Sequence, residues 1–344
     1  MSKKTEANCR LGKVGGQAVL EGVMMKSGER VAVSVRREDG AIASDVSSFS
    51  SVRKKHKFLN APIIRGVVNF IEMMKLSMST LNKSAELSGI TEGGEESKFE
   101  KWLSKKFGKS VLDVVMGVAT VLGLALALAL FFFLPNFLAT QLNKLIKIQV
   151  LESVFASIFK IAIFILYIYL VSLMKDIRRT FEYHGAEHKS IFCYENGEEL
   201  TVENVKRQRR FHPRCGTSFM FVMLILGMLL SLGVRLLVTY VIKFSIESNI
   251  LRTLFYTGVS LLVILPLVMG VGYEFLMYAG KHSNLFVRIL SAPGLWMQRI
   301  TTREPDDKQI EVAINSLKLA MPSEFPPEEE HAEKDSPDGE NAAD

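Results

Sequence analysis

The chain has 344 residues, of which 48% are hydrophobic and 23% are charged. This composition excludes an intrinsically disordered protein, and a content of only 3 cysteines excludes a disulfide-rich secreted scaffold. The net charge is +6, but residues 322–344 contain nine acidic residues and one lysine, so the preceding residues together carry +14. We therefore expect a basic folded body followed by an acidic, disordered tail (322–344).

Residues 10–60 are predicted to form a small β unit. From Gly15 to Phe49 the sequence alternates as strands do, and Asp39-Gly40 has the composition of a hairpin turn. The block GGQAVLEGVMM contains two adjacent glycines, which let the backbone approach a neighbouring group closely. Gln17 and Glu21 are polar groups within it and are candidates for substrate contact or for supporting a nearby site. A glycine turn leading into a buried strand is the alternative interpretation.

Residues 61–90 are predicted to form an amphipathic helix, followed by a linker (91–110). Apolar residues recur every three or four positions on one side, and Arg65 and Asn69 lie elsewhere on the helix. The predicted apolar stripe consists of Ile64, Val67, Val68, Ile71, Met74, Met78 and Leu81. Such a helix would pack on the β unit or lie on a membrane surface, and Arg65 and Asn69 are second candidates for substrate or supporting contacts.

Four apolar segments within residues 111–290 are long enough to cross a bilayer, which takes roughly 20 residues as a helix. They are Val111–Leu134, Val154–Met174, Thr217–Ile242 and Leu254–Leu276. The sequence therefore predicts a mainly α-helical polytopic membrane protein with four transmembrane helices and a small N-terminal cytoplasmic β unit.

The distribution of basic residues predicts the orientation. Nine Lys and Arg residues lie between the second and third segments, against two in each of the other two connections. Because basic residues in short connections stay preferentially in the cytoplasm, we expect both termini and residues 175–216 to be cytoplasmic.

Residues 175–216 contain the residues best suited to chemistry. His184 and His188 are four residues apart, so on a helix both imidazoles share one face, and Glu187 precedes the second. The order H-x-x-E-H occurs in inverted zincin peptidases, where two histidines bind zinc and the glutamate acts on water. His212 and Cys215 follow in the same segment, and imidazole with thiolate suits zinc better than magnesium or calcium.

This segment has more than one interpretation. The histidines could be solvated and Cys215 a small residue at the start of a span, without any metal. If a zinc ion or another divalent metal binds, four protein ligands would close a structural site, whereas three would leave a position for water. In the second case Glu187 could act as general base.

The last third of the chain contains two further candidates for substrate or supporting contacts. Glu274 is an ionisable residue close to the predicted cytoplasmic end of the last span, and Arg299 lies in a C-terminal segment (291–321) that could bind an anionic group. Alternatively, Glu274 is an interface carboxylate that faces water. After Pro305, Ile310, Ala313, Ile314 and Leu317 predict a second amphipathic helix.

Five blocks, GGQAVLEGVMMK, RGVVNF, YHGAEHK, HPRCGTSF and PGLWMQRITTREPDD, together resemble the YqhQ-like bacterial membrane family. This is a group of unknown function that is described as predicted metal-dependent enzymes. The resemblance runs from about Gly15 to Leu319. It implies a multi-pass protein of the bacterial inner membrane, with a metal site drawn from the third and fourth blocks, and it implies no substrate.

Two hypotheses follow. The first is a metal-dependent hydrolase that acts at the cytoplasmic face on a lipid-linked or peptide substrate. The second is a non-enzymatic regulator, assembly factor or transport component with a structural metal site. In either case membrane lipids are expected partners, and the basic clusters 53–57 and 206–210 could contact anionic lipid or a protein partner. No nucleic acid is expected, and the sequence predicts no oligomeric state.

Overall fold

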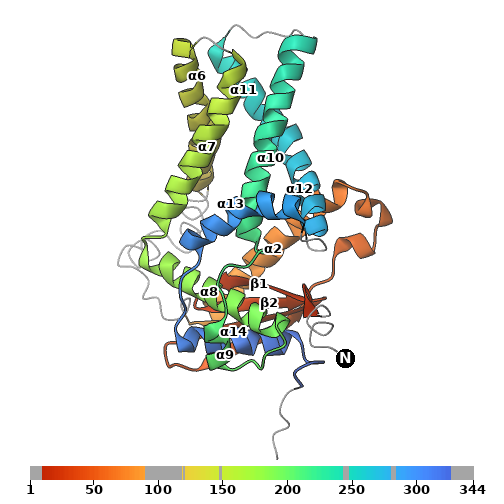
Figure 1. Ribbon diagram of the computed structural model, residues 1–344, viewed down its shortest axis with the longest axis vertical. Coiled ribbons are helices and arrows are strands. Elements are labelled where there is room, and N and C mark those ends of the chain that lie inside the picture. The colour runs from red at the N-terminus through yellow and green to blue at the C-terminus, as the bar shows by residue number, and fades with distance from the viewer. Residues whose placement is uncertain are drawn as a thin grey trace, which may run out of the picture.

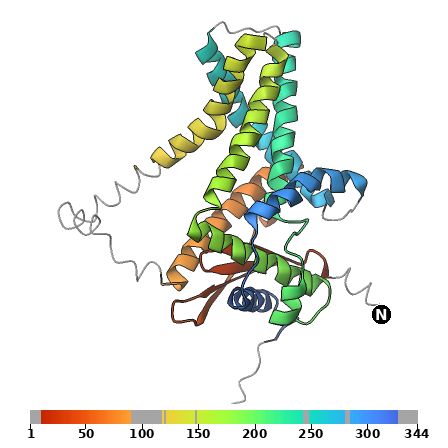
Figure 2. The same ribbon diagram turned by 60° about the vertical axis from the view of Figure 1, so that its left-hand side comes forward.

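The computed structural model describes residues 10–89, 118, 121–146, 149–242, 248–279 and 284–326. It consists of a bundle of long apolar helices and, at one end of it, a small β-sheet packed between shorter helices (Figures 1 and 2). A mainly helical chain with a small N-terminal β unit is therefore confirmed.

The sheet has four antiparallel strands in the order β1 (Val14–Val19), β2 (Gly22–Ser27), β3 (Arg30–Arg36) and β4 (Ile42–Ser48). The turn between β3 and β4 contains Gly40 at φ +86°, a conformation that glycine adopts without steric cost, so the predicted Asp39-Gly40 hairpin is confirmed. Because the strands pair in chain order, β1 and β4 are the two edges of the sheet.

Helices cover both faces of the sheet. Alternate residues of β2 point to opposite sides: Val23 and Met25 pack with α8 (Lys175–Glu195) and α14 (Asp307–Ala320), whereas Met24 packs on the side of α2 (Ile64–Leu87). The short helix α9 (Val202–Arg207) packs against α8 and α14. We call β1–β4 with α2, α8, α9 and α14 the sheet domain. Segments from four of the predicted units, 10–60, 61–90, 111–290 and 291–321, therefore pack together in it.

The predicted amphipathic helix exists, but a different face of it packs on the sheet. Ile71, Met74 and Met78 of the predicted stripe are exposed, while Leu76, Thr80 and Ser84 are buried. Small and hydroxylated residues allow α2 to lie close to β1. The Ser84 hydroxyl accepts a hydrogen bond from the Leu20 amide. The apolar stripe thus points away from the sheet.

The second predicted amphipathic helix is α14, and its predicted apolar residues are buried in the sheet domain. Asp306 and Gln309 form a reciprocal capping box at its start. The rest of the C-terminal segment belongs to α13 (Leu285–Thr301), which contains Pro293 and lies across the base of the bundle (Figure 1). Segment 291–321 is therefore two helices rather than one amphipathic unit.

The bundle contains three helices that are long and apolar enough to cross a membrane: Val121–Ile146, Val154–Val171 and Leu254–Ala279. They comprise η3 (Ala129–Phe133) with α6 (Leu134–Ile146), α7 (Gln149–Val171), and α11 (Asn249–Val259) with η5 (Ser260–Ile264) and α12 (Leu265–Ala279). The η3 and η5 segments, and η4 (Leu237–Ile242), are π-helical.

Two predicted spans have different bounds in the structure. The first was predicted to end at Leu134, but the helix continues to Ile146, because Pro135 directly follows the π-helical turn, where its missing N–H is tolerated. The third lies in α10 (Gly216–Leu236) and η4 (Leu237–Ile242), of which Val222–Val234 is a shorter apolar helix. Four spans thus stay a prediction.

The remaining elements connect these layers. Two short 3-10 helices, η1 (Val52–Lys54) and η2 (Lys57–Asn60), join the sheet to α2. Residues 175–216, the predicted cytoplasmic connection between the second and third spans, are mostly helical in α8 and α9. The predicted linker 91–110 and most of the acidic tail lie outside the described residues.

Candidate metal centre

Helix α8 positions two histidines beside the sheet. Its buried face, which includes Tyr183, Ile191 and Tyr194, packs into the core of the sheet domain and fixes the rotation of the helix. His184 and His188 then project from a flank of the helix, with their ring centroids 4.3 Å apart. The H-x-x-E-H spacing thus brings the two imidazoles together, as the sequence predicted.

Each histidine is held by a backbone carbonyl. His184 Nδ1 lies 2.8 Å from the carbonyl oxygen of Thr301, and His188 Nδ1 bonds to the carbonyl oxygen of Arg210. A carbonyl only accepts, so each Nδ1 carries the proton and each Nε2 presents a lone pair. Metal-binding histidines are commonly oriented in this way through the second ring nitrogen.

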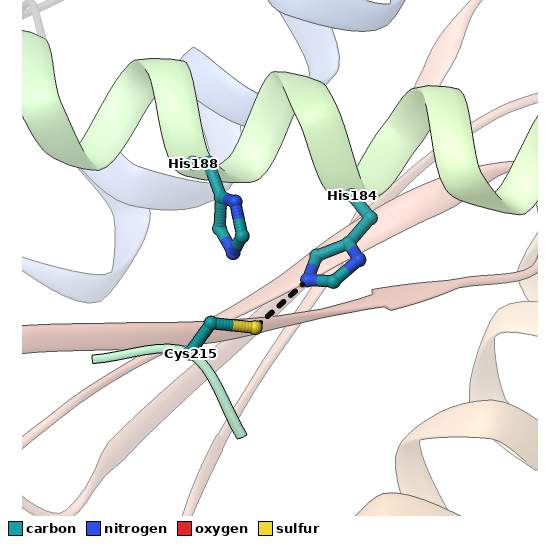
Figure 3. Close-up of side chains that lie close together, drawn as sticks. All are labelled: His184, His188 and Cys215. Atoms are coloured by element: carbon teal, nitrogen blue, oxygen red, sulfur yellow. Dashed lines mark hydrogen bonds between the residues drawn. The ribbon is translucent and has the colours of Figure 1, made fainter. Parts of the chain in front are cut away.

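Cys215 completes a cluster with the two histidines. It is the N-terminal cap of α10, where the helix dipole favours negative charge on the thiol, and its Sγ lies 3.3 Å from His184 Nε2 (Figure 3). The donor atoms of His184, His188 and Cys215 all lie within 4.8 Å of one another. Donors on one zinc ion lie within about 4.6 Å, since each bond is about 2.0 to 2.3 Å long, so small side-chain movements would suffice.

The cluster carries the signs of a cation site. His188 is 1% exposed, and its Nε2 is buried without a hydrogen-bond partner. A buried nitrogen in this state costs free energy unless something coordinates it. Burial also lowers the pKa of His188, so the imidazole is kept in the neutral form that binds metals. Two nitrogens and one sulfur fit zinc.

Glu187 lies next to the cluster and is almost fully buried. It packs on β1, where a Cβ atom at Gly16 would lie 2.8 Å from Glu187 Cγ and 2.9 Å from Oε1, so only glycine fits at that position. The Oε2 atom is buried without a hydrogen-bond partner. Burial raises the pKa of Glu187 to about 8. The first glycine block thus supports Glu187, a contact that the sequence alone did not reveal.

His212 has a different environment from the one predicted. Its Nε2 lies 3.4 Å from Glu195 Oε2, and Glu195 is also bound by the Arg214 guanidinium and the Gly12 amide. Gln298 exchanges two hydrogen bonds with the backbone of His212, at 2.8 and 2.7 Å. The His212 donor is therefore not among the three clustered ligand atoms; it helps to hold the segment that carries Cys215.

The other selected residues lie in separate contacts. Gln17 Nε2 donates to Ser77 Oγ at 2.7 Å, and Glu21 Oε1 accepts from Arg179 at 2.5 Å. Arg65 and Glu274 bind each other in a bidentate pair that joins α2 to α12. Asn69 is half-buried on α2, and Arg299 is exposed on α13.

Sequence reasoning missed several residues that hold the site. The carbonyl groups of Thr301 and Arg210 carry no side-chain signal, so no motif could identify them. Glu195 and Gln298 are polar residues that are 5% and 0% exposed. Only this burial, which the structure reveals, identifies them as residues that support the site.

Comparison with known proteins identifies the group. The profile of a family described as "Protein of unknown function (DUF1385)" matches residues 61–323. The chain belongs to this family. It is also 34% identical over 308 residues to the "Uncharacterized protein YqhQ" of Bacillus subtilis (strain 168), covering 88% of this chain and 90% of the relative. No solved structure matches. The expected YqhQ-like membership is thereby shown, while its description as a metal enzyme stays a prediction.

Proposed function

We propose that this chain is a membrane-bound, metal-dependent hydrolase that acts at the cytoplasmic face of the bacterial inner membrane on a lipid-linked or peptide substrate. The observation that carries the proposal is the directed geometry of the cluster. Two histidine Nε2 lone pairs, both fixed by carbonyl groups, point to one thiol, and a buried carboxyl group with one unpartnered oxygen lies beside them.

In this proposal His184, His188 and Cys215 hold zinc or another divalent cation. Three protein ligands would leave a coordination position open, and the ion would supply Lewis acidity for activating water and polarising a carbonyl group. Glu187 then accepts the proton of the attacking water and passes it to the leaving group as the scissile bond breaks. A bound cation would favour the carboxylate form of Glu187 that this role requires.

The position of the cluster supports a substrate at the membrane boundary. Cys215 immediately precedes α10, which enters the helical bundle, and the two histidines belong to the sheet domain. The cluster therefore lies between the two layers of the molecule. The excess of basic residues in 175–216 favours the cytoplasmic side for it.

The first test is the metal content of detergent-purified full-length protein. We expect about one zinc per chain, lost in the His184→Ala/His188→Ala double variant. His212→Gln should keep the metal, because that side chain faces Glu195, although it should unfold at a lower temperature. A protein without metal above background, purified without chelator, would contradict the proposal.

The second test uses Glu187→Gln. We expect full metal content with hydrolysis reduced by at least about 100-fold, as for loss of a general base. Glu199→Gln changes an exposed carboxylate of the same domain and should leave hydrolysis unchanged. Full hydrolysis by metal-loaded Glu187→Gln protein would exclude the assigned role.

A non-enzymatic role is the second candidate, and one observation favours it. The three donors come from α8 in the sheet domain and from the start of α10 in the bundle, so a metal would also fasten the two layers together. In that case Glu187→Gln would have little effect on function. His188→Ala would instead lower the unfolding temperature of the metal-loaded protein.

A further inference from the structure

Among the described residues, no strand pairs with the outer edge of β1, which lies beside the metal cluster. The turns between β1 and β2 and between β2 and β3 each contain two residues, Leu20-Glu21 and Gly28-Glu29, so the pairs Val19–Gly22 and Ser27–Arg30 exchange hydrogen bonds. Hydrogen-bonded and non-bonded pairs alternate along an antiparallel ladder. The amide and carbonyl groups of Gly15, Gln17 and Val19 therefore face β2.

The remaining groups of β1 face outward. These belong to Val14, Gly16 and Ala18, and in the described part of the chain none of them has a hydrogen-bond partner outside the sheet. Gly15 and Gly16 are both exposed. Consecutive glycines in a strand allow another backbone to approach closely. The outer edge of β1 thus offers an alternating row of free donors and acceptors.

This edge is not protected against strand pairing. Natural sheets usually cover an edge or place charged residues or proline on it. The sequence of β1, VGGQAV, contains neither, whereas β4 at the opposite edge carries Asp45. The β4 edge of this sheet is protected and the β1 edge is not. This difference indicates that the open edge at β1 has a use.

The cluster and the open edge lie on the same side of α8. This helix packs mainly over β1, while α14 packs over the inner strands β2 and β3. Glu182 of α8 faces α14, because its Oε2 accepts a hydrogen bond from Gln309. His184 is two residues further along, and residues on a helix turn by about 100° each, so it projects on the opposite flank, toward the open edge.

Glu187 connects the cluster to that edge directly. Its carboxyl group rests on Gly16, the residue whose amide and carbonyl groups point outward. A strand added to β1 would lie about 4.8 Å from it. One carbonyl group of such a strand would then lie beside Glu187 and close to the two histidines.

We infer that β1 binds its substrate as an extended peptide, added as a fifth antiparallel or parallel strand along Val14–Ala18. This inference rests on the proposed hydrolase and selects the peptide over the lipid-linked class. A peptide backbone supplies both N–H donors and carbonyl acceptors at strand spacing, and main-chain pairing at an open edge is an established mode of peptide recognition. A lipid headgroup offers phosphate acceptors and hydroxyl or ammonium donors, but it does not repeat them along a line at strand spacing.

The test measures amide hydrogen exchange at single residues in full-length protein in detergent. The probe is a set of peptides from a digest of β-casein, an unfolded protein, added to zinc-loaded Glu187→Gln protein so that turnover does not remove them. At peptide concentrations of about ten times Kd, exchange at Gly16 and Ala18 should slow by about tenfold. Gly15 and Gln17, which already bond to β2, should show no change.

Two variants test the pairing. Ala18→Pro removes an outward N–H, keeps the bonds to β2 and is compatible with an edge strand, so it should weaken peptide binding by about tenfold, the loss of one net hydrogen bond of about 1.4 kcal/mol. Ala18→Ser keeps the N–H and should bind as the parent does. The exchange pattern of the unchanged β1 strand still decides the matter if Ala18→Pro does not fold.

The outcomes separate the two proposals. Protection at Gly16 and Ala18 without hydrolysis by the parent protein would uphold strand addition and contradict the hydrolase. Hydrolysis with no protection at these amides would uphold the hydrolase and overturn strand addition. Protection by phosphatidylglycerol micelles, but not by peptides, would also overturn it.

Discussion

Glu187 is the residue at which the demands of folding and of chemistry differ most. Its carboxyl group is buried against Gly16 with one oxygen unpartnered, and burial raises its pKa to about 8 from an ordinary value of 4.5. The folded metal-free protein therefore binds this proton more tightly than the unfolded chain does. The stability of the metal-free protein should fall as the pH rises from about 4.5 to about 8, because ionisation is disfavoured only in the folded state.

Glu187→Gln removes that ionisation. In chelator-treated protein the variant should have the higher unfolding temperature at about pH 9, and the difference should shrink toward about pH 5, where Glu187 is protonated in the fold. Thermal unfolding followed by fluorescence in detergent over this range measures it. A difference that is the same at every pH would mean that the charge on Glu187 has no part in it.

At the scale of elements, the contact between α2 and α12 joins the sheet domain to the bundle. A Cβ atom at Gly66 would lie 2.7 Å from Gly270 Cα, and one at Gly270 would lie 2.7 Å from Ile63 Cα. Ile63 itself has φ +69°, a strained value for a β-branched residue. The bidentate pair of Arg65 and Glu274 lies in the same contact. Two glycines thus permit a backbone approach that no other residue would allow.

Gly270→Ala should therefore destabilise the protein by about 1 to 3 kcal/mol, the usual cost of overpacking, and lower the unfolding temperature. Gly258→Ala is the matched control, since a Cβ atom there meets nothing within 4 Å and alanine favours a helix by up to about 1 kcal/mol. Thermal unfolding of both variants in the same detergent measures the difference. Equal unfolding temperatures of the two variants would show that the contact between α2 and α12 accommodates the added methyl group without cost.

At the scale of the whole molecule, the sheet domain is assembled from segments far apart in the sequence. Strands β1–β4 come from the N-terminus, α8 from the middle and α14 from near the C-terminus. Ile310 and Leu317 of α14 are fully buried against the sheet, and Ser316 donates to the Ala32 carbonyl oxygen at 3.0 Å. This core can therefore close only after α14, near the C-terminus, has been synthesised.

Truncation after residue 306 should abolish cooperative unfolding of the sheet domain, because it removes one whole face of the core. Truncation after residue 326 removes only acidic tail residues and should leave the unfolding temperature unchanged. Protease resistance and thermal unfolding of the two purified proteins measure the effect. A folded sheet domain in the shorter protein would show that α14 is dispensable.

The sequence by itself determined much of the local structure and indicated the residues from which the candidate site is drawn. Period-2 alternation with Asp39-Gly40 predicted the β3–β4 hairpin, and three of the predicted apolar segments are helices long enough to span a membrane. The spacing of His184 and His188 predicted a shared face because helical periodicity is a local property. Cys215 and Glu187 were also selected from the sequence.

Only the tertiary structure decided which of these groups meet and which face of each element is buried. It directed His212 to Glu195, paired Arg65 with Glu274, and turned the apolar stripe of α2 away from the sheet. It also placed Gly16 under Glu187 and brought Ser316 of α14 to Ala32 of β3, 284 residues earlier in the chain. These contacts depend on the packing of distant segments and on backbone carbonyl groups, neither of which leaves a pattern in the local order of residue types.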